Sequence, residues 1–178
     1  MSDCIQPISK EQCQQVQELT YQYIDKAREC YDFKSENLPV LFDLKGRAAG
    51  MYRVRNKFRL IRYNPFIFAK YYADNLATTV PHEVAHYVSD CLYGLKKIKP
   101  HGREWQQIMQ HFGADASVTC QYDMTGIPVR RQRRISYICD CQQYDLSMLR
   151  HNRLMRGEAK YRCRLCGSAL RPDKSAGV

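Results

Sequence analysis

The stretch "TTVPHEVAHYVSD", residues 78–90, places two histidines and a glutamate in the spacing His-Glu-x-x-His. It predicts a helix from about residue 79 to residue 93, because Pro81 is tolerated in a first turn and Gly94 is a typical terminating residue. On such a helix His82 and His86 lie one turn apart on the same face, so both imidazoles can bind one metal ion. Glu83 is offset around the helix and can act as a general base on water beside that metal.

The same stretch also fits an ordinary amphipathic helix with exposed histidines. Its apolar residues recur at helical spacing and would form one buried stripe: Val80, Val84, Tyr87, Val88 and Cys91. A hydrolytic zinc takes three protein ligands and keeps one position open. The choice between the two interpretations therefore depends on a third ligand.

Two candidates for the third ligand stand in "HGREWQQIMQHFG", residues 101–113, which predicts a further helix. His101 and Glu104 are three residues apart and share one face at the start of this helix. The metzincin continuation is excluded, because it requires Gly and His where this chain has Ser89 and Leu92. From the residues alone, both His101 and Glu104 stay candidates.

Other segments predict an α+β fold. Residues 9–12 carry the Ser-x-x-Gln capping pattern ahead of a helix over residues 10–31. Short apolar runs within residues 38–65 predict two or three antiparallel strands, and "PFIFAKYYA", residues 65–73, predicts a short helix behind them. Periodicity is lost from residue 114, which indicates an irregular connection to a second unit.

The composition excludes some classes of protein. No window approaches the roughly 18 consecutive apolar residues of a membrane span, and the start "MSDCIQPISKEQCQQ" is too polar for a secretory signal. We therefore expect a cytoplasmic protein with no membrane partner. Nine cysteines are many for that compartment, where thiols stay reduced, so clustered cysteines indicate a metal site.

The cysteines fall into two groups. Five are scattered singly and are expected to be small core or surface thiols: Cys4, Cys13, Cys30, Cys91 and Cys120. The other four form two pairs, in "YICDCQQY" and "YRCRLCG", and suit a four-cysteine structural zinc site: Cys139, Cys141, Cys163 and Cys166. A zinc would explain how about forty residues hold a fold without a large core.

The first cysteine pair departs from the usual spacing. One residue separates Cys139 from Cys141, whereas a ribbon knuckle has two, so that backbone amides can turn toward sulfur. If strain excludes one of these thiolates, His151 is the reserve ligand. A redox role for Cys163 and Cys166 is disfavoured, because no strand-helix context surrounds them.

The net charge of +10 is concentrated near the C-terminus. Residues 130–172 hold ten Arg and one Lys against three acidic residues, a net charge of +8. Such a segment suits a polyanion, and a solvated surface is the alternative. Candidate phosphate contacts are Arg150, Arg153, Arg156, Lys160, Arg162 and Arg164. Tyr137, Tyr144 and Tyr161 either stack on unpaired bases or serve packing.

The combination of "HEVAH", a gap of fourteen residues and "HGREW" resembles the SprT-like zinc metallopeptidase family, which also contains the eukaryotic Spartan protease. "FDLKGRAAGMYR", "IRYNP" and the cysteine tail agree, so the resemblance covers roughly residues 10–172. It implies a zincin-like metallopeptidase domain at 1–128, with a small antiparallel sheet and flanking helices. A basic zinc ribbon at 129–172 and a flexible tail at 173–178 would follow.

The resemblance also implies roles for single residues. His82, His86 and His101 would bind a catalytic zinc, Glu83 would be the base, and Glu104 would be a neighbour of the site. A strand near "FRLIRY", residues 58–63, would pair with an extended substrate. Asp90 would either orient a ligand or, as we expect, be an exposed helix acid.

The implied function is that of a zinc metalloendopeptidase, with one catalytic and one structural zinc. It would be recruited to DNA, in particular single-stranded DNA, would cut proteins bound there, and would lie at the nucleoid. The alternative is a non-catalytic, zinc-containing DNA-associated binding protein. The oligomeric state is open.

Overall fold

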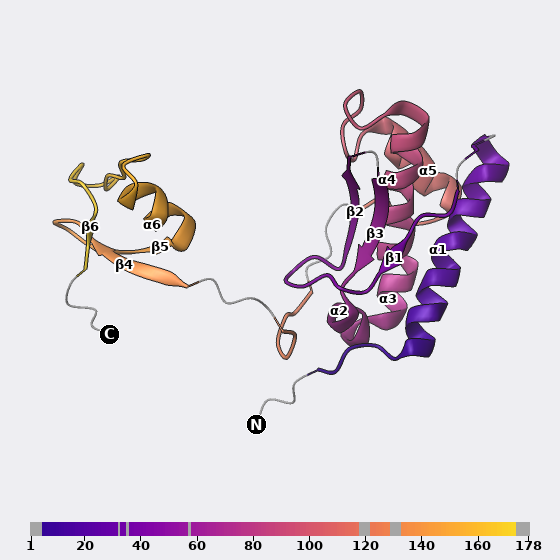
Figure 1. Cartoon of the computed structure of the whole chain (residues 1–178), viewed down its shortest axis with the longest axis horizontal. Helices are drawn as coiled ribbons and strands as arrows, with labels where there is room; N and C mark the ends of the chain where they lie inside the picture. The colour runs from indigo at the N-terminus through magenta and orange to yellow at the C-terminus, as the bar shows by residue number, and fades with distance from the viewer. Residues whose placement is uncertain are drawn as a thin grey trace. The chain divides into compact units, whose positions relative to one another are not determined.

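The structure is a computed structural model of the 178-residue chain, and it describes residues 5–31, 33–34, 36–56, 58–117, 122–128 and 133–173. The chain divides into two compact units, unit 1 at residues 1–129 and unit 2 at residues 130–178 (Figure 1). Some predictions fall on residues outside the described ones: the domain boundary at 128/129, the tail beyond residue 173, Cys4 and Cys120.

Unit 1 begins with the predicted long helix, α1, at Lys10–Tyr31. The predicted capping box is present: the Ser9 amide donates to Gln12 Oε1 at 3.0 Å and the Gln12 amide donates to Ser9 Oγ at 3.2 Å. The two bonds satisfy amides that have no partner within the helix. Val16, Thr20, Ile24 and Ala27 form its buried face.

In the described residues the sheet of unit 1 has three strands: β1 at Val40–Leu41, β2 at Gly50–Arg55 and β3 at Phe58–Tyr63. Their spatial order is β1-β3-β2, with β2 and β3 antiparallel and β1 and β3 parallel. The prediction of a purely antiparallel sheet is wrong for β1. Residues 42–49 connect β1 to β2. Strand β3 follows β2 in the chain but lies between β1 and β2 in the sheet, and it runs antiparallel to β2 and parallel to β1.

The position of β3 contradicts a second expectation. "FRLIRY" is the central strand, with β1 and β2 on its two sides, so it is not a free edge for a substrate. The edge strand beside the His-Glu-x-x-His helix is β2, which that helix contacts most closely among the strands.

Two short helices follow the sheet where one was predicted: α2 at Pro65–Lys70 and α3 at Tyr72–Ala77. Asn64 caps α2, because its side chain accepts from the amides of Phe66 and Ile67. The break lies at Tyr71, whose φ of −132° and ψ of 50° are not helical.

The next two helices match their predictions. The His-Glu-x-x-His helix, α4, spans Thr79–Tyr93 and ends at Gly94, whose φ is 81°. The following helix, α5, spans Arg103–Phe112 and ends at Gly113 in the left-handed conformation. α4 contacts α1, α3, α5 and β2, and is therefore the centre of the unit (Figure 1).

The predicted apolar stripe of α4 is real. Val80, Val84, Tyr87 and Val88 are buried, and Cys91 is partly buried. They join a core that counts eighteen buried side chains among the described residues. The stripe and the metal-binding interpretation are therefore compatible, since the stripe anchors the helix that carries the histidines.

Unit 2 is a small antiparallel sheet with one helix. Its strands are β4 at Arg134–Ile138, β5 at Gln143–Ser147 and β6 at Arg171–Pro172, in the order β5-β4-β6. The helix, α6, spans Met148–Met155. Its described core is only five buried side chains: Tyr137, Cys139, Leu146, Cys163 and Leu170. The chain as a whole is thus α+β, and no helix in its described parts is long and apolar enough to cross a membrane.

Candidate metal centres

Three histidines of unit 1 converge on one point. The Nε2 atoms of His82, His86 and His101 lie 3.0–3.2 Å from one another. Nitrogen ligands of a tetrahedral zinc lie about 3.3 Å apart, given Zn–N bonds of about 2.05 Å. Among the described residues, no other His, Cys, Asp or Glu belongs to this group, and Glu104 lies outside it. The donor set therefore fits a zinc ion with three protein ligands.

The imidazoles are held neutral. Burial, together with the neighbouring histidines, lowers the pKa of His86 to about 3 and that of His82 to about 4. Burial lowers the pKa of His101 as well. At neutral pH all three rings can therefore offer a lone pair, which is the form that binds a metal.

Trp105 supports the three rings, a role that the sequence did not reveal. It is fully buried, and its ring centroid lies 4.8 Å from those of His82 and His101 and 5.7 Å from that of His86. Its Nε1 donates to the backbone carbonyl of His82 at 3.3 Å. The signal available was its place four residues after His101, in the first turn of α5.

Glu83 lies beside the histidines and is 6% exposed. Burial raises the pKa of this carboxyl to about 7, opposed by a hydrogen bond of 2.6 Å from the backbone amide of Tyr52 in β2. A pKa near neutrality suits a group that must accept and release a proton.

Gly50 permits the close approach of β2 to Glu83. A Cβ at this position would stand 2.6 Å from Glu83 Cγ and 2.7 Å from Thr79 Cγ2. Real Cβ contacts are not this short, so only glycine fits here while α4 and β2 keep their separation.

Asp90 is not the exposed helix acid that we expected. It is 8% exposed and accepts three hydrogen bonds: from the Tyr52 hydroxyl at 2.7 Å, from Arg59 Nε at 2.7 Å and from the Leu95 amide at 3.2 Å. Tyr52 is therefore bound to α4 twice, through its amide to Glu83 and through its hydroxyl to Asp90. None of the hydrogen bonds of Asp90 described here goes to a histidine.

A pocket of about 250 Å³ opens beside this centre. His82, Glu83 and Gly50 form one part of its lining. Arg47, Ala48, Ala49, Thr78, Thr79, Ser117 and Tyr122 complete it. The candidate base therefore lines an open pocket.

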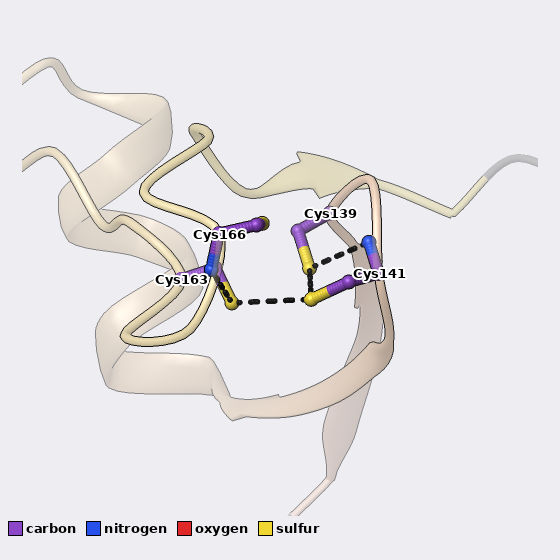
Figure 2. Close-up of side chains that lie close together, drawn as sticks. All are labelled: Cys139, Cys141, Cys163 and Cys166. Carbon is purple, nitrogen blue, oxygen red and sulfur yellow. Dashed lines mark hydrogen bonds between the residues drawn. The ribbon is translucent and has the colours of Figure 1, made fainter.

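The four cysteines of unit 2 form the second group (Figure 2). Cys139 and Cys141 come from the β4–β5 connection, and Cys163 and Cys166 from the loop ahead of β6. All four sulfurs lie within 4.8 Å of one another, and two neighbouring pairs are 3.4 and 3.6 Å apart. Sulfur ligands of a tetrahedral zinc lie about 3.8 Å apart. The set fits a closed structural site.

The short first pair still forms a knuckle. The amides of Cys141 and Gln142 both donate to Cys139 Sγ, at 3.4 and 3.3 Å. The second pair does the same, with the amides of Leu165 and Cys166 pointing at Cys163 Sγ. The turn brings two amides to one sulfur despite the missing residue, and both Cys139 and Cys141 belong to the four-cysteine group.

His151 does not belong to the cysteine group. Its Nδ1 lies 2.9 Å from the hydroxyl of Tyr137. Tyr137 itself is fully buried, so of its two predicted roles the structure favours packing. Tyr144 and Tyr161 are partly buried against the same core. Strand alternation turns Tyr137 of β4 inward.

The six predicted phosphate contacts are all exposed: Arg150, Arg153, Arg156, Lys160, Arg162 and Arg164. They differ in what else they bind. Arg156 forms two hydrogen bonds with Glu158, which neutralises its charge. Lys160 and Arg162 line a pocket of about 240 Å³ with apolar walls that include Leu154 and Leu170.

Comparison with known proteins shows which family the chain resembles over most of unit 1. The model of the SprT-like family matches residues 17–132. The chain belongs to the SprT-like family. The predicted resemblance is thus confirmed, and membership indicates a metallopeptidase-type unit. The matched range ends before the first cysteine pair.

Relatives named Protein SprT agree with this membership. The protein from Vibrio parahaemolyticus is 35% identical over 132 residues, covering 74% of this chain and 76% of its own. That from Klebsiella pneumoniae is 34% identical over 137 residues, covering 76% and 78%. That from Erwinia tasmaniensis is 40% identical over 115 residues, covering 64% and 65%. No solved structure matches the chain.

Proposed function

We propose that this SprT-like protein is a zinc metalloendopeptidase of the His-Glu-x-x-His type with a zincin-like catalytic unit. The observation that carries the proposal is the convergence of three neutral imidazoles beside a buried carboxyl whose pKa lies near 7. With three protein ligands, a position stays open for water and substrate. A structural site would instead use a fourth protein ligand, as the cysteine group does.

The chemistry divides between the ion and the chain. Zinc supplies Lewis-acid chemistry, in that it polarises a carbonyl and acidifies water. His82, His86 and His101 would hold it, and Trp105 keeps their rings in place. Glu83 accepts the proton of the attacking water and passes it to the leaving amine. The Tyr52 amide orients the Glu83 carboxylate for that transfer.

The edge strand β2 is the candidate partner of an extended substrate. Among the described strands it pairs only with β3, and its other side faces the pocket through Gly50. Addition of a substrate segment to this edge would lay a peptide bond beside Glu83. The proposed substrates are proteins, because strand addition recognises an extended polypeptide backbone.

Unit 2 would recruit the peptidase to DNA, in particular to single strands. Five exposed cations without an acidic partner among the described residues support this role: Arg150, Arg153, Lys160, Arg162 and Arg164. Phosphate contacts of this kind give affinity without sequence readout. A peptidase recruited to DNA in this way would cleave DNA-associated proteins at the nucleoid. On that basis we propose that the protein lies in the cytoplasm.

The test compares the wild type with Glu83→Gln, using a DNA-binding protein as substrate with and without single-stranded DNA. We expect cleavage by the wild type that DNA stimulates, and none by Glu83→Gln at equal zinc content. Two zinc ions per chain are expected. No cleavage by the wild type at full zinc occupancy would favour the non-catalytic DNA-associated protein, and cleavage without any DNA effect would remove the recruitment role.

A further inference from the structure

Unit 1 contains a basic region of its own, in its sheet. Residues 44–63 hold seven Lys and Arg and no Asp or Glu. The rest of residues 1–129 holds nine basic residues against fourteen acidic ones. The sheet is therefore a positive region in an otherwise acidic unit, and the small net charge of unit 1 hides it.

The strand register assigns three of these charges, those of Arg53, Arg55 and Arg62, to one face. Tyr52 pairs with Ile61 on the face that packs on the core. The alternate pairs point to the opposite, outward face, and each joins an arginine to an apolar residue: Met51 with Arg62, Arg53 with Leu60, and Arg55 with Phe58. None of these six side chains belongs to the hydrophobic core described for the unit.

Two of the outward arginines are available for a ligand. Arg62 is paired with Asp43 at 2.8 Å. Arg53 and Arg55 are exposed, and no acidic side chain of the described residues pairs with either. Lys45 and Arg47 are exposed on the connection that leads into β2.

Protection of an edge strand against aggregation explains part of this pattern, since charges on β2 would repel another strand. It does not explain Phe58. That side chain is 59% exposed, directly opposite Arg55, and an exposed large apolar residue works against such protection. An aromatic ring beside unpaired arginines is instead the composition of a surface that binds unpaired bases.

We propose that the outward face of this sheet, formed by Met51, Arg53, Arg55, Phe58, Leu60 and Arg62, binds single-stranded nucleic acid. Arg53 and Arg55 contact phosphates, and Phe58 stacks on a base. A duplex keeps its bases stacked inside and leaves Phe58 without a partner. The site is separate from the cysteine unit and does not depend on peptidase activity.

The first measurement isolates the phosphate contacts. Binding of the full chain to a fluorescent 20-residue oligodeoxythymidylate is followed by anisotropy over a range of salt concentrations. Each single-strand phosphate contact adds about 0.7 to the salt slope, which is about fivefold in affinity at 0.1 M salt. Arg53→Gln with Arg55→Gln should therefore lower the slope by about 1.4 and weaken binding about 25-fold.

The matched control is Lys96→Gln with Lys97→Gln, which removes the same charge from exposed positions after α4. It should leave the salt slope unchanged. Arg150→Gln with Arg153→Gln reports on unit 2 separately. A sheet variant that binds like the Lys96 and Lys97 control overturns the proposal.

The second measurement isolates base stacking. Phe58→Ala should weaken oligodeoxythymidylate binding about tenfold, the order of one lost stacking contact, and leave binding of inorganic polyphosphate, which has no bases, unchanged. A duplex of the same length should be insensitive to the substitution. Unchanged oligonucleotide affinity, or an equal loss for polyphosphate or duplex, would contradict a single-strand site on this face.

Discussion

The two candidate metal centres differ in what surrounds them. The histidine site is formed by α4 and the turn before α5, against a core of eighteen described buried side chains, and Trp105 contacts all three rings. The cysteine site sits in a core of five, two of which are the ligands Cys139 and Cys163. The first site is therefore arranged by the protein before any metal binds, whereas the second must be arranged by the metal itself.

Loss of the cysteine site gives the largest expected effect. Structural zinc contributes about 10–16 kcal/mol of apparent binding free energy in small zinc domains, more than a core of five residues can supply. Cys163→Ser should therefore unfold unit 2 and leave unit 1 folded. Hydrogen exchange read by peptide should lose protection over β4 and β5 and keep it over α1 and α4.

The control for this comparison is His101→Ala, which removes one ligand from the other site. It should lower zinc content by one ion per chain and leave exchange protection in both units. If unit 2 stays protected in Cys163→Ser, or if α4 loses protection in His101→Ala, the contrast between the two sites is wrong.

The helix that carries His82, Glu83 and His86 is tied to the sheet by the buried Asp90, which accepts from Tyr52 and Arg59. Asp90→Asn leaves Arg59 without its counter-charge in a partly buried position. We expect a loss of about 3 kcal/mol in the free energy of unfolding of unit 1 at pH 7. Asp25→Asn is the matched control, since Asp25 pairs with Arg28 on the surface and should cost about 0.5 kcal/mol or less.

The effect of Asp90→Asn should depend on pH. Burial raises the pKa of Asp90, but hydrogen bonds from Tyr52, Arg59 and the Leu95 amide outweigh it, so the pKa lies below its ordinary value of 3.8. A depressed pKa adds stability above the unfolded value, and this is lost as pH falls through the folded value. Chemical denaturation at pH 7 and below pH 4 should show the difference between variant and wild type shrinking. A constant difference would argue against an ionised Asp90.

Gly50→Ala tests how closely β2 must approach Glu83. The added Cβ would stand 2.6 Å from Glu83 Cγ, so the carboxyl must move away from the position that Tyr52 sets. We expect kcat to fall about 10- to 100-fold, as for other groups that orient a metal-site residue, with zinc content unchanged. Gly113→Ala is the control: its φ of 70° makes it costly in stability, but nothing lies within 4 Å. Equal activity of the two variants would contradict the close approach.

Sequence and structure agree where the signals are local. The bounds of α1, α4 and α5 follow from capping residues, helical periodicity and terminating glycines, and the i, i+4 spacing brings His82 to His86. His101 lies fifteen residues beyond His86, and only the family resemblance chose it over Glu104.

The features that sequence reasoning missed depend on tertiary pairing. β1 runs parallel to β3 because β3 lies between β1 and β2 in the sheet. Asp90 is buried because Arg59 and Tyr52 of the sheet donate hydrogen bonds to it. No local pattern around Asp90 carries that information. The basic sheet was visible in the sequence, as a run of twenty residues without an acid, but a net charge taken over the whole unit cancels it.

The smallest expected effect is that of His151→Ala, which tests whether His151 is a zinc ligand or only a neighbour of the cysteine site. His151 was the reserve ligand in place of a strained cysteine, yet its Nδ1 lies against the Tyr137 hydroxyl. His151→Ala should therefore keep the zinc content of unit 2 and lose only this hydrogen bond, about 1 kcal/mol. Cys141→Ser, which removes one of the two thiolates in doubt, should lose the zinc. Zinc content and thermal unfolding of both variants decide the matter: if His151→Ala loses zinc and Cys141→Ser keeps it, the site uses three cysteines and one histidine, and the four-cysteine geometry is wrong.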